Sequence, residues 1–103
     1  MLGGVNFIMK MFEWDRKKNE LNIFKHDVSF EEASTVFEDD YAVTLFDEDH
    51  SEYEDRFKII GISKNLLELT VCHCYRGENE DIVRIISARK ATKAEMEIYE
   101  RGM

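Results

Sequence analysis

The sequence predicts one α+β domain, built on an antiparallel β-sheet with helices gathered to one side of it. First, the chain has 103 residues, the length of a single domain, with no proline and no Ser/Gly-rich linker. Second, 44% of the residues are hydrophobic, which suits one modest core. Third, several segments with strand-like patterns follow one another through short connections, and this order favours antiparallel pairing.

The beginning of the chain predicts a short strand and a helix. We expect residues 1–10 to form an irregular lead-in and Phe12–Trp14 to form a strand. Asp15 is suited to cap a helix over Arg16–Lys25, because its carboxylate can accept a free amide of the first turn. Asp27 then stands where a chain often turns left-handed, which Asp tolerates better than most residues. The apolar side of this helix is expected to comprise Trp14, Leu21 and Phe24.

A second helix is predicted over Phe30–Phe37. The run that begins at Ser29 is a capping box, in which Ser29 caps the helix and the side chain of Glu32 reaches back to it. Three acidic residues, at 38–40, end the helix. The residues expected to face inward are Phe30, Ala33, Val36 and Phe37.

Four strands and a last helix complete the expected domain. The strands are predicted at Tyr41–Phe46, Arg56–Ser63, Leu66–Arg76 and Ile82–Lys90. Gly61 indicates a bulge or a close approach of another chain segment. Thr92 and Glu95 form a further capping box, which opens a helix that runs through Arg101 and ends at Gly102.

Charge is distributed unevenly along the chain. The net charge is −8, which taken alone argues against a nucleic-acid-binding protein. However, residues 27–55 hold twelve acidic residues and no Lys or Arg, which leaves 10 acidic and 14 basic residues, a net of +4, for the remainder. The acidic segment is either a solvated surface or a docking site for a basic partner, with the flanks free to meet an anion.

The composition predicts a cytoplasmic protein with reduced thiols, no membrane partner and no cofactor. No segment approaches the roughly 18 apolar residues of a membrane span, and the first nine residues lack a secretory pattern. Cys72, His73 and Cys74 invite a metal site, but on a strand the thiols and the imidazole point to opposite faces. Because no second cysteine pair completes a tetrahedral site, we expect buried apolar cysteines and no metal.

Basic residues of the last three strands are candidates for phosphate contacts, since a guanidinium group presents a fork of donors that matches phosphate oxygens. These residues are Arg56, Arg76, Arg84, Arg89 and Lys90. Arg84 and Arg89 are five positions apart, so a regular strand places them on opposite faces, and they converge only if the strand bends. The alternative for each arginine is a surface position paired with one of the many carboxylates.

Histidine is the side chain that most readily moves a proton near neutral pH. His26 and His50 are favoured for function over His73, which lies on the more apolar face of its strand. His26 could equally serve to end a helix, and His50 to hydrogen-bond within a loop. In the polar connection at residues 47–55, the side chains of Glu52, Glu54 and Asp55, beside His50 and Arg56, form either a polar cluster or a solvated loop.

Three blocks of the chain resemble the BrnT family, in order and over roughly residues 11–101. The first is Phe12-Glu13-Trp14-Asp15, then Lys18-Asn19, Asn22 and Lys25-His26-x-Val28-Ser29-Phe30-Glu31-Glu32-Ala33. The second is His50-Ser51-Glu52-x-Glu54-x-Arg56-Phe57, with Gly61. The third is Arg84-Ile85-Ile86-Ser87-Ala88-Arg89-Lys90-Ala91-Thr92, with Glu95 and Tyr99. Residues 1–103 are therefore expected to form a single BrnT-like domain.

The resemblance implies a RelE-like ribonuclease toxin of a type II toxin–antitoxin pair, which cleaves RNA without a metal and arrests translation. It implies a BrnA-like antitoxin as the partner, and contact with DNA only through that antitoxin. This chain departs from the family at Asp27, where glycine is usual, and in its strong acidity.

The resemblance and the side-chain chemistry together suggest roles for seven residues. Phosphate binding is expected from Arg56, Arg84 and Arg89. Lys25 and His26 supply further charge or a proton shuttle, Glu54 is a base or an orienter of the neighbouring arginine, and His50 is an acid. Two other functions stay open: a catalytically weak binding module that acts only in an autorepressing antitoxin complex, and a small metal-binding protein built around the two cysteines.

Overall fold

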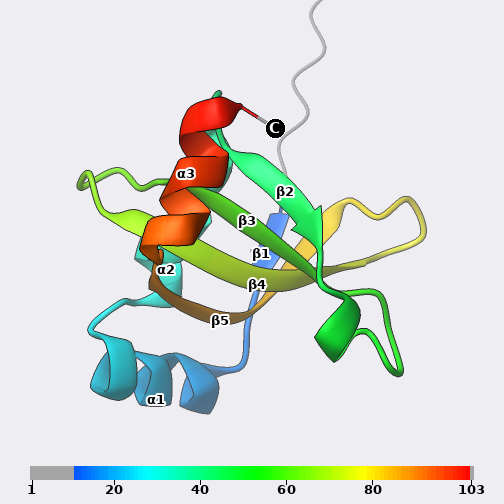
Figure 1. Ribbon diagram of the computed structural model, residues 1–103. Coiled ribbons are helices and arrows are strands. Elements are labelled where there is room, and N and C mark those ends of the chain that lie inside the picture. Colours follow the sequence, from blue (N-terminus) through cyan, green and yellow to red (C-terminus); the bar gives the residue numbers. More distant parts are fainter. Residues whose placement is uncertain (1–10, 103) are drawn as a thin grey trace, which may run out of the picture.

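The computed structural model describes residues 11–102, so the expected lead-in over residues 1–10 lies outside the described residues (Figure 1). The elements are β1 (Met11–Glu13), α1 (Arg16–His26), α2 (Phe30–Ser34), the 3-10 turn η1 (Thr35–Glu38), β2 (Val43–Phe46), the 3-10 turn η2 (Glu48–His50), β3 (Phe57–Ile62), β4 (Glu68–Arg76), β5 (Ile82–Lys90) and α3 (Lys93–Arg101). The strand order is β1-β5-β4-β3-β2. The predicted α+β class is confirmed, although β1 pairs with β5 in parallel and only the other pairings are antiparallel.

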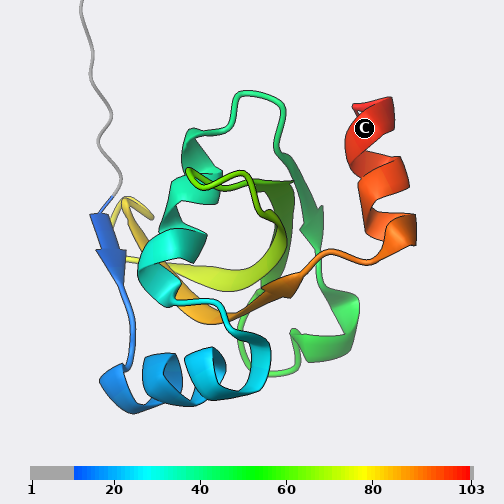
Figure 2. The same cartoon turned by 90° about the vertical axis from the view of Figure 1, so that its left-hand side faces the viewer.

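Helices lie on both sides of the curved sheet, and not on one side as the sequence suggested. In Figure 2, α2 and η1 cover one face, α3 lies beyond the opposite face, and α1 runs below β5. The core forms on the α2 side, where Phe30, Ala33 and Val36 are fully buried, as predicted, and Phe37 packs against them. The opposite face is covered only in part, by α3 and the loop that contains η2. None of the helices among residues 11–102 is long and apolar enough to cross a membrane.

Local capping chemistry sets the helix ends largely as predicted. The Asp15 carboxylate accepts a hydrogen bond from Lys18 N at 2.9 Å, and Asp27 ends α1 with φ of 57°. The capping box of Thr92 and Glu95 is complete at the start of α3. At α2 the Ser29 hydroxyl caps as expected, but the expected return contact of Glu32 is wrong. Its carboxylate instead binds Asn65 at the turn between β3 and β4.

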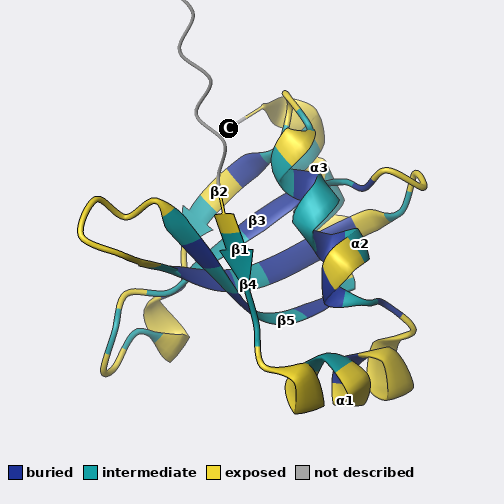
Figure 3. Ribbon diagram, turned by 180° about the vertical axis from the view of Figure 1, so that it is seen from behind, coloured by how far each residue is buried: buried dark blue, intermediate teal, exposed yellow. Residues whose placement is uncertain are grey.

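The expected apolar side of α1 is wrong for two of its three residues. Leu21 is 51% exposed and Phe24 is 88% exposed, whereas Trp14 packs against the core as expected. The buried residue of α1 is polar: Asn22 donates to Val28 O and Ala88 O, both at 2.8 Å, and accepts from Ala88 N at 3.1 Å. This helix is held to β5 by hydrogen bonds and not by an apolar stripe, which is why most of its surface is exposed in Figure 3.

A β-bulge in β5 decides which side chains share the open face of the sheet. Cys74 pairs with Arg84, and Cys72 pairs with Ser87, so β5 has one extra residue, Ile86, between these pairs. Because Cys72 and Cys74 share a face, Arg84 and Ser87 share it too, as does Arg89 two residues further on. The sequence-based assignment of Arg84 and Arg89 to opposite faces is therefore wrong, because it assumed a regular strand. No bulge occurs at Gly61, whose close approach is confirmed by Val36 Cγ1 only 2.9 Å from where a Cβ would stand.

Candidate functional site

The open face of the sheet carries a cavity of about 230 Å³, which we call the strand pocket. It lies between the loop that contains η2 and the middle of β3, β4 and β5. Its lining residues are Asp47, His50, Arg56, Lys58, Cys72, Ile86, Ser87 and Arg89. Three of these side chains are cationic and one is an imidazole, so the pocket is suited to a phosphate group.

A second cavity, of about 240 Å³, lies where α1 runs beside β5, and we call it the helix pocket. It is lined by Lys18, Leu21, Asn22, Lys25, His26, Ile86 and Ser87. The two pockets share Ile86 and Ser87, so they adjoin at the bulge. We call them together the basic groove.

The loop between β2 and β3 is closed at its base, which places two pocket residues on one wall. Asp47 N donates to Arg56 O at 2.9 Å, and the Ser51 hydroxyl donates to Asp47 O at 2.6 Å. Ser51 Oγ also accepts from Arg56 N at 3.0 Å. These contacts within the protein position the loop segment that carries His50 and the backbone of Arg56. Of the expected polar cluster, Glu54 contacts Arg56, whereas Glu52 and Asp55 are exposed to solvent.

His50 is paired with a buried carboxylate. Its Nδ1 lies 3.0 Å from Asp47 Oδ2, and the side chain of Asp47 is 4% exposed while that of His50 is 66% exposed. When Nδ1–H donates to the carboxylate, Nε2 is left as the free basic nitrogen. The arrangement fixes the tautomer and the orientation of an accessible imidazole, which is what proton transfer requires. The sequence analysis did not single out Asp47. The one sequence feature that could have indicated this pairing is that Asp47 lies three residues before His50.

Glu54 binds two arginines and does not enter the strand pocket. Its carboxylate accepts from Arg76 Nη1 at 2.8 Å and from Arg56 Nε at 3.3 Å. The hydrogen bond from Arg76, with that from Arg56, lowers the pKa of Glu54 despite the opposing effect of burial. A carboxylate held in this way is a weak base, and its contact with Nε orients the guanidinium of Arg56.

Arg89 reaches the strand pocket from β5 and is clamped by α3. Glu95 accepts from both terminal nitrogens of Arg89, at 2.7 and 2.9 Å, and also from Thr70 Oγ1 and Thr92 N. Burial alone would raise the pKa of Glu95, but the bonds from Arg89, Thr92 and Thr70 outweigh it and lower this pKa to about 2. The charge of Arg89 is thus largely compensated.

The other basic residues divide into two groups. Arg84 lies outside both pockets, where its Nη1 donates to Glu13 Oε2 at 2.7 Å and links β5 to β1. Within residues 11–102, no ion pair engages Lys58, Lys25 or His26. Lys58 was missed from the sequence, although the strand expected over Arg56–Ser63 places it two residues after Arg56, on the same face.

His73 and Cys74 are buried, whereas Cys72, which was also expected to be buried, is only partly so. His73 is fully buried in an aromatic cluster on the core face, with its ring 4.8 Å from that of Phe37. Cys74 is buried, which raises the pKa of its thiol, and Cys72 lines the strand pocket. Across residues 11–102, no group of three or more His, Cys, Asp or Glu side chains is arranged to hold a metal ion.

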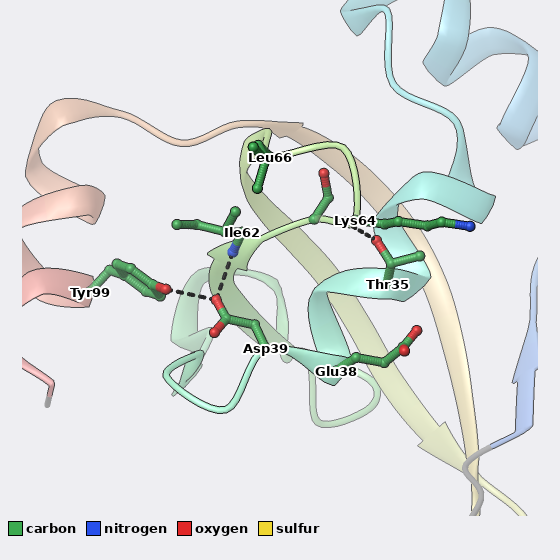
Figure 4. A pocket seen from close by; sticks show the side chains of 8 residues that line it. Thr35, Glu38, Asp39, Ile62, Lys64, Leu66 and Tyr99 are labelled. Atoms are coloured by element: carbon green, nitrogen blue, oxygen red, sulfur yellow. Dashed lines mark hydrogen bonds between the residues drawn. The ribbon is translucent and has the colours of Figure 1, made fainter.

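A larger cavity, of about 410 Å³, lies between α3, η1 and the turn after β3 (Figure 4). There Asp39 Oδ2 accepts from Tyr99 Oη and from Ile62 N, both at 2.8 Å. Burial of the phenol, together with the adjacent Asp39 carboxylate, raises the pKa of Tyr99 to about 12. The wall of this cavity carries two carboxylates, of Glu38 and Asp39, against one lysine, Lys64, so it is less suited to phosphate than the basic groove, with which it shares no residue.

Comparisons with known proteins agree with the fold. Residues 14–95 match the family described as the ribonuclease toxin, BrnT, of type II toxin–antitoxin systems. Among solved structures, the chain is similar to the Brucella abortus ribonuclease toxin, BrnT, with 23% sequence identity and a TM-score of 0.63. That alignment covers 82% of this chain and 100% of the other. At this identity the likeness shows a shared fold. No curated protein matches the sequence.

Proposed function

We propose that this chain, which belongs to the BrnT family of ribonuclease toxins of type II toxin–antitoxin systems, cleaves RNA in the strand pocket and thereby arrests translation. One observation carries the proposal: an imidazole oriented by a buried carboxylate shares a cavity with three cationic side chains. Those side chains are Arg56, Lys58 and Arg89.

The arrangement supports cleavage by the 2′-hydroxyl of the RNA itself. His50 Nε2 takes the 2′-hydroxyl proton while that oxygen attacks phosphorus, and Asp47 stabilises the imidazolium that forms. The cationic groups stabilise the charge that grows on the phosphate oxygens. The imidazolium then gives its proton to the departing 5′-oxygen. The products are a 2′,3′-cyclic phosphate and a 5′-hydroxyl end, so atoms and protons balance.

Within this proposal the other expected site residues take supporting positions. Glu54 orients Arg56 and is not the base, since its hydrogen bonds from two arginines lower its pKa and so its affinity for a proton. Arg84 anchors β1 through Glu13 and does not bind the scissile phosphate.

The test is cleavage of a labelled RNA by the purified chain. We expect fragments with cyclic phosphate ends, and a rate that falls roughly 100-fold or more in His50→Ala. Asp47→Asn is expected to lower the rate by about 10-fold or more, because the amide no longer fixes the imidazolium. Asp49→Asn, in the same loop but outside the strand pocket, is the matched control and should cleave normally. Intact RNA with the wild-type chain, or normal cleavage by His50→Ala, would overturn the proposal.

Membership of a type II system implies an antitoxin partner. We propose that this partner is a BrnA-like antitoxin, and that the complex contacts DNA only through it. A second candidate function is supported by one observation: the pocket arginines are already paired with carboxylates, at Glu54 and Glu95. In that case the chain acts only by forming the repressor complex. Induction without the antitoxin gene separates the two, since only the ribonuclease arrests growth and degrades RNA.

A further inference from the structure

The helix pocket continues the strand pocket across a single pair of side chains. Both cavities are lined by Ile86, the extra residue of the bulge, and by Ser87 beside it. A polymer whose phosphate sits in the strand pocket therefore enters the helix pocket by passing over these two residues. Each cavity is below the roughly 300 Å³ at which pockets for drug-sized ligands begin, so each suits one small unit of a longer ligand.

The helix pocket is held open by contacts that use no ligand-binding group. The side chain of Asn22 donates to Val28 O and Ala88 O and accepts from Ala88 N. These hydrogen bonds hold α1 against β5 beside the bulge. The position of the helix is therefore set before any ligand binds. Asn22 supports the pocket and is not itself available to a ligand.

The lining of the helix pocket combines apolar surface with uncompensated positive charge. Leu21 is half exposed and faces the cavity together with Ile86, which offers a surface for the flat face of a base. Lys25 and His26 have no ion pair within residues 11–102, and no acidic side chain lines this cavity. In the strand pocket the two arginines are paired with carboxylates, and among its cationic side chains Lys58 alone has no ion pair within residues 11–102.

We infer that the helix pocket is a binding subsite for the nucleotide next to the scissile phosphate, and that Lys25 and His26 act there in binding and not in proton transfer. The base packs on Leu21 and Ile86, and its phosphate meets Lys25. The inference rests on the proposed ribonuclease function. It makes α1, together with Lys58, a source of the net ionic attraction for RNA and leaves the chemistry to the strand pocket.

The test is binding of a short single-stranded RNA whose sugars carry 2′-O-methyl groups, so that it cannot be cleaved. Fluorescence anisotropy over a range of salt concentrations gives the Kd and its salt slope. We expect Lys25→Ala to weaken binding by about five-fold and to reduce the slope by about 0.7, the value for one phosphate contact on a single strand. Leu21→Ala should weaken binding by about three-fold with an unchanged slope.

Lys17→Ala is the matched control, because Lys17 is an exposed lysine of the same helix outside the pocket. It should change the Kd by less than about two-fold. Binding by Lys25→Ala and Leu21→Ala that equals binding by Lys17→Ala would overturn the subsite. Because the probe is uncleavable, this result is independent of catalysis: absence of cleavage by the wild-type chain refutes the ribonuclease proposal, whereas normal binding by both pocket variants refutes the subsite.

Discussion

Replacing Glu95 with glutamine removes the charge of the contact between α3 and β5 and keeps its size. The pKa of Glu95 is about 2 against an ordinary 4.5, and each unit corresponds to about 1.36 kcal/mol, so the folded state favours the ionised form by about 3 kcal/mol. The partner side chain, Arg89, is 39% exposed, and solvent screening lowers the effect. We therefore expect Glu95→Gln to reduce the free energy of unfolding by about 2 kcal/mol at pH 7.

Thermal unfolding measures this effect. For a domain near 100 residues, 1 kcal/mol corresponds to roughly 4–8 °C, so the variant should melt roughly 10 °C lower at pH 7. Because the folded-state pKa is depressed, the contribution of Glu95 is complete above pH 4.5 and is lost as the pH falls through about 2. The melting temperatures of the wild type and the variant should therefore approach each other as the pH falls from 4.5 to about 2.

The matched control is Glu97→Gln, an exposed residue of the same helix, which should alter the free energy of unfolding by less than about 0.5 kcal/mol. An equal melting temperature for Glu95→Gln and the wild type at pH 7 would refute the reasoning. A difference in melting temperature between the two proteins that stays the same down to pH 2 would also refute the reasoning. Such a difference could not come from the ionisation of Glu95.

Two further predictions follow from the geometry. Arg56→Ala and Arg89→Ala should each lower RNA cleavage by about 10-fold or more, whereas Arg84→Ala should cleave within about two-fold of the wild type, all measured as initial rates on one RNA. If Arg84→Ala instead loses as much activity as the other two, the placement of the scissile phosphate is wrong. Asn22→Ala leaves Ala88 and Val28 with buried unpaired backbone groups and should cost about 3 kcal/mol in urea unfolding. A cost below about 1 kcal/mol would show that α1 is held by other contacts.

Features with local causes could be predicted from the sequence. The caps at Asp15 and Thr92 and the left-handed turn at Asp27 depend on side chains within a few residues of the helix ends. Short-range alternation likewise placed the strands. The prediction that Glu32 completes the capping box at Ser29 was wrong, because its carboxylate binds Asn65 instead. Asn65 is distant in sequence, so no rule based on neighbouring residues could have predicted this contact.

Features that depend on distant partners could not be predicted. Counting along β5 placed Arg84 and Arg89 on opposite faces, because the extra residue Ile86 is defined only by its pairing with β4. The burial of Asn22 likewise depends on the backbone of Ala88, 66 residues away. Of the expected site residues, the structure brings His50, Arg56 and Arg89 into one pocket and Lys25 and His26 into the adjoining one. Glu54 supports this site from outside, and Arg84 is excluded from it.

An overall charge of −8 is compatible with the proposed RNA binding, because the basic side chains of the groove are of two kinds. Some are paired with carboxylates, and others have no acidic partner. Arg56 and Arg89 are paired with Glu54 and Glu95, so they add little long-range attraction, but their guanidinium groups are already oriented for the proposed RNA phosphate. A fixed group loses little freedom when a phosphate binds and stabilises the transition state without reorganisation. Attraction must then come from cations with no carboxylate partner, such as Lys58 and Lys25. Such attraction is strongly screened, so the affinity for RNA should fall steeply with salt, while the cleavage rate of bound RNA depends much less on it.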